Sequence, residues 1–298
     1  MEQKTIKADL LLLLTAAIWG FAFVAQRVGM DYVGPFTYNA VRFALGSLSL
    51  LPLIFWTGRN RKTEAVITGG NGRAIAVGGL IAGIVLFAGA SFQQAGLVYT
   101  TAGNAGFITG LYVVMVPLFG LFWAQRPALG TWLGAILAAI GLYFLSITDS
   151  LTISFGDLLV LISAGFWAAH VLIIGWLSPK MDALKLASVQ FAVCALLSLL
   201  VAFGYEAISL VGIRQAAIPI LYGGLFSVGI AYTLQVVAQR HAHPAHSAIL
   251  LSLEGVFAAI GGVLLLSEVL TLRSLLGCAL MLSGMLLSEL SGYLFKKS

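Results

Sequence analysis

The feature that most constrains this chain is a series of long apolar segments, each about as long as a bilayer is thick. A transmembrane helix needs roughly 20 consecutive apolar residues. Lipid offers no partners for backbone N–H and C=O groups, so such segments must be helical. The sequence predicts an all-α integral membrane protein with ten spans, at 9–29, 35–57, 74–98, 102–124, 130–148, 157–177, 186–205, 217–239, 244–267 and 273–294.

Composition supports this class and argues against two others. Only 9% of the residues are charged, whereas soluble domains carry about 25%. The net charge is +5, but the basic residues lie in short loops between apolar runs, so we expect no nucleic-acid partner. Cys194 and Cys278 lie inside apolar segments, where they indicate neither a disulfide nor a metal framework. No cofactor is expected.

The distribution of Lys and Arg predicts the orientation. One set of loops and tails holds only Arg214 and Arg273, and the other holds twelve basic residues: Lys4, Lys7, Arg59, Arg61, Lys62, Arg73, Arg126, Lys180, Lys185, Arg240, Lys296 and Lys297. By the positive-inside rule the second set is cytoplasmic. Both termini are then cytoplasmic, in a cell membrane such as the bacterial inner membrane, and the number of spans must be even.

The chain divides into two similar halves, 1–148 and 149–298. At one constant offset Asp9-Leu10-Leu11 aligns with Asp157-Leu158-Leu159, Trp19 with Trp167, and Val41-Arg42-Phe43-Ala44 with Val189-Gln190-Phe191-Ala192. With five spans in each half, the second half enters the membrane from the opposite side. Inverted repeats of this kind are typical of secondary transporters, because two such halves can expose one central site alternately to either side.

Two segments resemble a known family. Tyr99–Tyr112 and Pro244–Glu254 are similar to the fourth- and ninth-helix signatures of the EamA family in the drug/metabolite transporter superfamily, and Trp19-Gly20 fits the same pattern. The family often has a proline one position after the Tyr or Glu, where this chain has Val113 and Gly255. The resemblance implies transport, since family members include exporters of amino acids and other metabolites, drug-efflux proteins and uptake permeases.

Polar and aromatic residues within the spans indicate where a substrate site lies, because they are costly in lipid. Helical spacing puts Trp19 and Gln26 on one face of the first span, and Trp167 and His170 on the matching face of the sixth. The cavity candidates are Trp19, Gln26, Gln94, Tyr112, Trp167, His170, Gln190, Tyr232 and Gln235. The alternative is that these rings fill space between helices and that the amides join helices by hydrogen bonds.

Two charged residues lie deep in the spans, Arg42 and Glu254. They are interpreted either as a buried structural ion pair or, with Glu254 changing protonation during the cycle, as a site that couples transport to protons. His241, His243 and His246 cluster near a cytoplasmic turn without adjacent Cys or carboxylate ligands. We interpret them as interfacial residues, so no metal is expected.

The sequence thus favours a secondary transporter, and the resemblance implies an exporter of amino acids or related compounds. A non-coupled facilitator or channel, or a drug-efflux protein, is the alternative. An intramembrane enzyme is disfavoured, because the chain offers no acidic pair or activated nucleophile in its spans. The expected partners are a small-molecule substrate and the bilayer, and the protein is expected to be a monomer or a homodimer.

Overall fold

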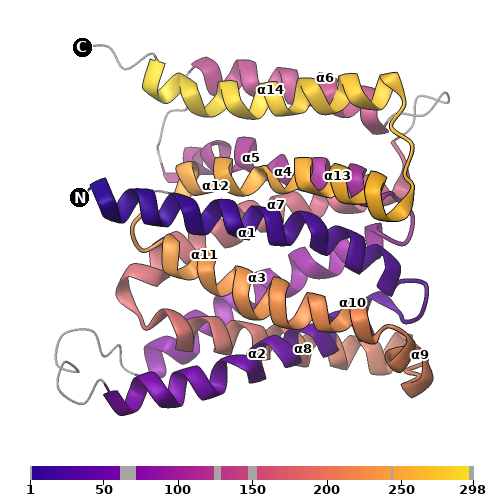
Figure 1. The fold of residues 1–298 in the computed structure, drawn as a ribbon. Helices are drawn as coiled ribbons and strands as arrows, with labels where there is room; N and C mark the ends of the chain where they lie inside the picture. Colours follow the sequence, from indigo (N-terminus) through magenta and orange to yellow (C-terminus); the bar gives the residue numbers. More distant parts are fainter. Residues whose placement is uncertain (1, 61–71, 124–128, 147–152, 243, 295–298) are drawn as a thin grey trace.

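The computed structural model describes residues 2–60, 72–123, 129–146, 153–242 and 244–294, and these residues are almost entirely helical. Figure 1 shows long helices that lie roughly side by side. The elements are α1 (Glu2–Gly29), α2 (Pro35–Asn60), α3 (Gly72–Gly96), α4 (Ala102–Gly110), α5 (Tyr112–Phe119), η1 (Gly120–Trp123), α6 (Leu129–Ser146), α7 (Phe155–Leu177), η2 (Ser178–Lys180), α8 (Ala183–Tyr205), α9 (Leu210–Gln215), α10 (Ala217–Leu221), η3 (Tyr222–Tyr232), α11 (Thr233–Ala238), α12 (Pro244–Ser252), α13 (Glu254–Leu266) and α14 (Leu272–Leu294).

Eight helical stretches in the described part are long and apolar enough to cross a membrane. The membrane class is therefore confirmed. The predicted spans 130–148 and 273–294 correspond to α6 and α14, whose apolar stretches, Trp132–Phe144 and Leu272–Leu287, are shorter than those of the other eight. The count of ten spans stays a prediction.

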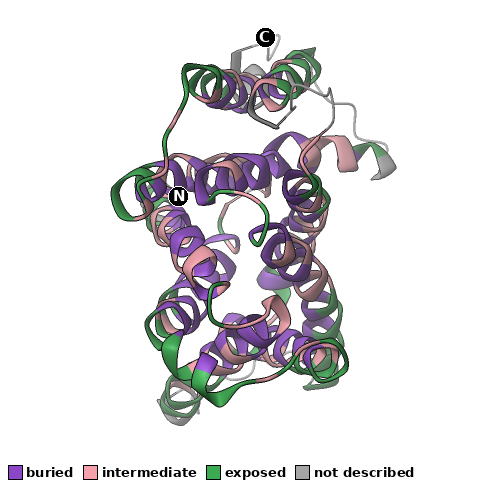
Figure 2. Cartoon of the chain, turned by 90° about the vertical axis from the view of Figure 1, so that its right-hand side faces the viewer, coloured by how far each residue is buried: buried purple, intermediate pink, exposed green. Residues whose placement is uncertain are grey.

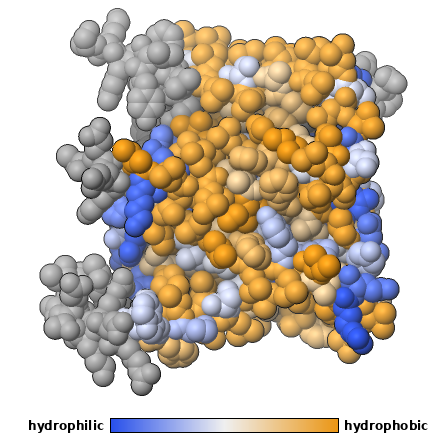
Figure 3. Space-filling view, viewed as in Figure 1, coloured by the Kyte–Doolittle hydropathy of each residue, from blue (hydrophilic) through white to orange (hydrophobic). Residues whose placement is uncertain are grey.

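The outer surface is the one expected for a protein in lipid. Figure 3 shows apolar surface across the middle of one face, with hydrophilic residues near the left and right edges toward which the helices run. Large apolar side chains such as Leu200, Phe203 and Leu264 are about 70% exposed. Such side chains are stable only in an apolar solvent, so this belt marks the lipid-facing surface.

Helices from the two ends of the sequence pack against one another throughout the structure. Three such pairs of packed helices are α2 with α8, α4 with α13, and α6 with α14. In addition, α1 packs against α13 and η3, while α7 packs against α3, α4 and α5. The α6–α14 pair is set apart from the remaining helices in both Figure 1 and Figure 2. The centre of the molecule lies among α1, α7, η3 and α13.

The start of α2 is capped by a carboxylate from a distant part of the chain. Glu206 follows α8, and its two carboxylate oxygens accept hydrogen bonds from the backbone N–H groups of Phe36 (2.8 Å) and Thr37 (2.7 Å). The Thr37 hydroxyl donates a third bond at 2.6 Å. The first N–H groups of a helix lack intrahelical partners and carry partial positive charge, so this carboxylate satisfies them.

The start of α4 is capped in the same way by Glu268, which follows α13. Its carboxylate accepts hydrogen bonds from the backbone N–H groups of Ala102 (2.7 Å) and Gly103 (3.1 Å). Ser267 ends α13 in the left-handed conformation, with φ 55°. That conformation ends the helix and reverses the chain direction, and Glu268 follows it directly. Both caps join a segment after residue 149 to a helix before it.

Close approach of helices depends on glycine at the crossing of α1 and α13. Gly20 lies so close to α13 that an added Cβ would stand 2.8 Å from the carbonyl oxygen of Glu254 and 2.9 Å from the backbone nitrogen of Ala258. Small residues permit such backbone-to-backbone approach in membrane proteins. The crossing places α1 and α13 directly beside each other, at the level of Trp19.

Candidate functional site

Two helix breaks at matching positions shape the centre of the molecule. Leu111 separates α4 from α5, and Leu253 separates α12 from α13, with φ/ψ of −60°/−14° and −62°/−12°. At each break a backbone N–H donates to the carbonyl three residues earlier instead of four: Val114 N to Leu111 O and Val256 N to Leu253 O, both 3.0 Å long. The residues directly after the breaks are Tyr112 and Glu254, which the breaks present to a central cavity.

The segment η3 is a π-helix of 11 residues. π-Helical stretches are rare and are frequent at functional sites, because their wider turn frees carbonyl groups from the regular ladder. Here the Ser227 carbonyl accepts a hydrogen bond from the Trp19 indole nitrogen at 3.2 Å, and the Ala231 carbonyl accepts one from the Thr15 hydroxyl at 3.3 Å. These two hydrogen bonds therefore join α1 to the π-helix, whose last residue is Tyr232.

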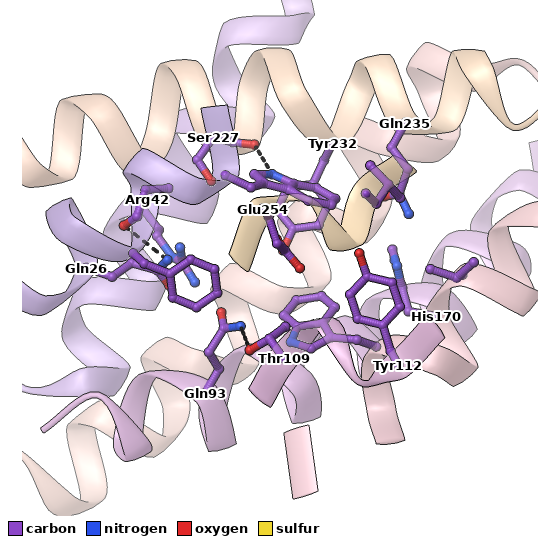
Figure 4. Close-up of a pocket in the computed structure, with 16 residues that line it drawn as sticks. Gln26, Arg42, Gln93, Thr109, Tyr112, His170, Ser227, Tyr232, Gln235 and Glu254 are labelled. Carbon is purple, nitrogen blue, oxygen red and sulfur yellow. Dashed lines mark hydrogen bonds between the residues drawn. The ribbon is translucent and has the colours of Figure 1, made fainter. Parts of the chain in front are cut away.

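A cavity lies at this centre, and Figure 4 shows the side chains that line it. About 30 Å³ of free space remains inside it, which is room for a few water molecules. Its lining residues come from nearly all of the central helices: Trp19, Ala22, Phe23, Gln26, Arg42, Gln93, Thr109, Tyr112, Trp167, His170, Val171, Ser227, Tyr232, Gln235, Leu251 and Glu254. The side chains leave little free space in the cavity in this conformation.

Tyr232 is the centre of an aromatic cluster beside the cavity. The centroid of its ring lies 4.5 Å from that of Trp19, 6.0 Å from that of Trp167 and 6.3 Å from that of His170. Aromatic rings at such separations stabilise one another beyond the effect of burial alone. The two tryptophans that align between the halves therefore both lie beside one tyrosine.

Six buried polar atoms on residues that line this cavity have no hydrogen-bond partner among the described residues. They are Gln26 Oε1, Arg42 Nη2, Tyr112 Oη, Trp167 Nε1, Gln235 Oε1 and Glu254 Oε1. Buried polar atoms are nearly always paired. Eight more unpaired atoms lie elsewhere among the described residues, and these six are the ones on residues that line the cavity, where a bound molecule can reach them. Donors and acceptors are both present, which suits a ligand that both donates and accepts hydrogen bonds.

Arg42 and Glu254 both line the cavity but do not pair with each other. The Arg42 Nε donates to Asn39 Oδ1 at 2.9 Å, and Asn39 in turn donates to the Ala90 carbonyl at 3.1 Å. The Arg42 guanidinium also lies 4.8 Å from the centroid of the Phe43 ring. Within the described residues the structure records no ion pair between Arg42 and Glu254, because Arg42 is held by these neighbours instead.

Nine of the eleven residues singled out from the sequence come together at the cavity, and two do not. Gln94 donates from Nε2 to the carbonyl oxygen of Gln26 at 3.1 Å. Gln190 contacts His170 Nε2 through Oε1 at 2.9 Å. These two amides hold lining residues in place from behind. The cavity is also lined by residues outside that candidate set, including Phe23, Gln93, Thr109 and Ser227. Phe23 and Gln93 could have been found from the sequence, because each is a large or polar residue within a predicted span.

The predicted histidine cluster does not assemble a metal site in the described part of the chain. The His246 Nε2 lies 2.8 Å from Asp9 Oδ1. His243 falls outside the described residues. A second contact of this kind lies elsewhere, where the Thr100 hydroxyl, just before α4, is 2.5 Å from Asp157 Oδ1 on α7. Asp157 is the residue that aligns in sequence with Asp9.

Comparison with known proteins gives consistent results. The model of the EamA-like transporter family matches residues 6–147 and 154–290. An uncharacterized transporter of Archaeoglobus fulgidus is 34% identical over 96% of this chain and 87% of its own length. The uncharacterized transporter YoaV of Bacillus subtilis is 23% identical over 95% and 97%. These names indicate a transporter rather than an enzyme.

The fold also occurs in a protein of known crystal structure. The two chains superimpose with a TM-score of 0.72 at 18% sequence identity, and the match covers 98% of each. At this identity the likeness concerns the fold alone. It extends over the full length, so the arrangement of helices around the central cavity belongs to a known architecture.

Proposed function

Because the chain belongs to the EamA-like transporter family, we propose that it is a secondary transporter whose substrate binds in the central cavity. The observation that carries this proposal is the set of six unpaired buried polar atoms around that one cavity. A substrate that forms hydrogen bonds with them satisfies groups whose burial is otherwise unfavourable. The aromatic cluster around Tyr232 supplies an apolar wall for the rest of the molecule.

We further propose that ten spans form two inverted repeats, 1–148 and 149–298, which open the cavity alternately to the two sides. The matching breaks at Leu111 and Leu253 support this arrangement. The packing of α1 and α7 also supports it, because α1 packs against α12, α13 and η3, and α7 packs against the corresponding elements α4, α5 and α3. The free space of about 30 Å³ supports it as well, since a metabolite needs more room than a few water molecules. The halves must therefore move apart for a substrate to enter.

The proposed substrates are amino acids or related compounds, and the proposed direction is export from the cell. The mixture of aromatic rings, amides and two opposite charges in the cavity supports a small substrate with several polar groups. The export direction rests on the likeness of Tyr99–Tyr112 and Pro244–Glu254 to the family signatures.

Purified protein in liposomes tests the transport function. We expect saturable exchange of a radiolabelled amino acid, and accumulation above its equilibrium level when a proton gradient is imposed. A set of labelled amino acids, amines and organic acids widens the search, with protein-free liposomes as the control. Flux that equilibrates but never accumulates under any ion gradient favours a facilitator, and no flux of any compound contradicts the proposal.

Labelling of single cysteines with a membrane-impermeant reagent tests the proposed orientation. We replace the buried Cys194 and Cys278 with serine, then introduce Lys180→Cys or Arg214→Cys at two exposed positions. In intact cells we expect labelling at position 214 only, because the loop that carries Lys180 belongs to the basic, cytoplasmic set. Labelling at position 180 before cell lysis would reverse the topology.

A further inference from the structure

We propose that Arg42 and Glu254 determine substrate specificity by binding the two opposite charges of one zwitterionic molecule. Arg42 binds the acidic group of the substrate and Glu254 binds its ammonium group. The rings of Trp19 and Tyr232 contact the apolar part of the same molecule. The proposal rests on the proposed transport function. It adds that compounds with only one of the two charges are poor substrates.

Arg42 has the geometry of an anion-binding residue. It is 1% exposed, and only its Nε is used in a hydrogen bond to a neighbouring side chain. Its Nη2 has no partner and the residue lines the cavity. Asn39 and Phe43 fix the guanidinium from outside the cavity, so the unpaired edge is already oriented. A planar guanidinium with a free edge is well suited to a carboxylate.

Glu254 has the complementary properties. It is 4% exposed, and its Oε1 has no hydrogen-bond partner in the described part of the chain, although the carboxyl group lies near the Tyr112 hydroxyl. Figure 4 shows the carboxyl group pointing into the middle of the cavity. No cationic side chain other than Arg42 lines the cavity in the described part of the chain. An ammonium group can donate to this oxygen and neutralise the carboxylate at the same time.

The separation of the two charges explains why a zwitterion suits the cavity better than a simple ion. Figure 4 shows Arg42 and Gln26 at one end, Glu254 near the middle, and His170 and Gln235 toward the other end. A buried charge without a partner is destabilising, and each singly charged ligand leaves one such charge behind. A zwitterion provides a partner for both charges in a single binding event.

Four compounds that share one side chain test this assignment. Phenylalanine is zwitterionic, phenylalaninamide keeps only the ammonium, N-acetylphenylalanine keeps only the carboxylate, and N-acetylphenylalaninamide is uncharged. The readouts are competition with exchange in liposomes and the rise in melting temperature of the purified protein. For the unmodified protein we expect each singly charged analogue to bind about tenfold or more weakly than phenylalanine, since a lost charged hydrogen bond has an effect of this size.

Substitutions assign each charge to its residue. With Arg42→Gln, phenylalanine and phenylalaninamide should bind almost equally, while the preference for a free amine over its acetylated form remains. With Glu254→Gln the pattern should reverse. Arg27→Gln is the matched control, because Arg27 is partly exposed, pairs with Asp31 at 2.9 Å and lies outside the cavity. If Arg42→Gln does not fold, Arg42→Lys, which keeps the charge but not the planar edge, should still reduce the preference for the acid.

The outcomes separate this inference from the transport function. Equal binding of the four compounds overturns it, as does an Arg42→Gln protein that still prefers the acid over the amide. N-acetylphenylalanine binding as well as phenylalanine overturns the role of Glu254 and indicates a purely anionic substrate. A transported set that contains no zwitterion also overturns the inference, and in each of these cases transport itself stands.

Discussion

Replacing Gly20 with leucine is expected to remove most of the correctly folded protein from the membrane. The reason is the crossing of α1 and α13, where an added Cβ would stand 2.8 Å from the Glu254 carbonyl oxygen. Backbone atoms cannot rotate away as a flexible side chain can, so the helices must separate. Overpacking of this kind costs about 3 kcal/mol or more. Size-exclusion profiles and melting temperatures of detergent-extracted protein measure the effect.

Gly204→Leu provides the matched control for this prediction. Gly204 lies in α8, and apart from its chain neighbours and the backbone of its own helix no described atom comes within 4 Å of the position of an added Cβ. The same chemical change should therefore leave yield and melting temperature at their original values. Gly20→Ala should fall between the two, since its single methyl group meets the same backbone. Equal behaviour of Gly20→Leu and Gly204→Leu would show that α1 and α13 do not approach closely.

The second large effect is expected from the paired tryptophans. Trp19→Ala and Trp167→Ala should each lower the transport rate about tenfold or more, because large aromatic residues often contribute most of the binding energy at a site. Each change removes one of the two indole rings beside Tyr232. Trp176→Ala is the control, since Trp176 is on α7 but 62% exposed and outside the cavity. Initial rates in liposomes, normalised to inserted protein, provide the measurement.

Substitution by phenylalanine separates the roles of the two indole nitrogens. Trp19 Nε1 is bonded to the Ser227 carbonyl, so Trp19→Phe should lower the melting temperature. Trp167 Nε1 has no hydrogen-bond partner among the residues that the structure describes, so Trp167→Phe should leave the melting temperature unchanged and weaken substrate binding. If both alanine variants transport at the original rate, these rings only fill space and the substrate binds elsewhere.

Apolarity predicted which segments cross the membrane, and it was less informative about where helices begin and end. The predicted span 186–205 starts three residues after α8 does, because Asp182 caps the helix from outside the apolar segment through the N–H groups of Leu184 and Lys185. Similarly, α2 continues beyond residue 57 to Asn60. A hydrophobic segment indicates which residues contact lipid, whereas local hydrogen bonds determine where a helix begins and ends.

The family resemblance drawn from the signature segments is confirmed by the match over residues 6–147 and 154–290. Helical spacing also predicted that Trp19 and Gln26 share a face, and both line the cavity. Spacing failed for Ser227 because it lies in a π-helix, which follows a different residue period. It could not separate Gln94 from Gln93 either, since adjacent residues of one helix face different neighbours that only the packed structure reveals.

The carboxylate caps at α2 and α4 have a consequence for the order of synthesis. Glu206 and Glu268 belong to the part of the chain that the ribosome makes last, yet they complete helices made first. At ordinary translation rates Glu268 emerges on the order of ten seconds after Gly103. During that interval the amides at the start of α4 lack the carboxylate with which they pair in the finished protein. The first turns of α2 and α4 therefore reach their final hydrogen bonding only after much of the second half of the chain has been made.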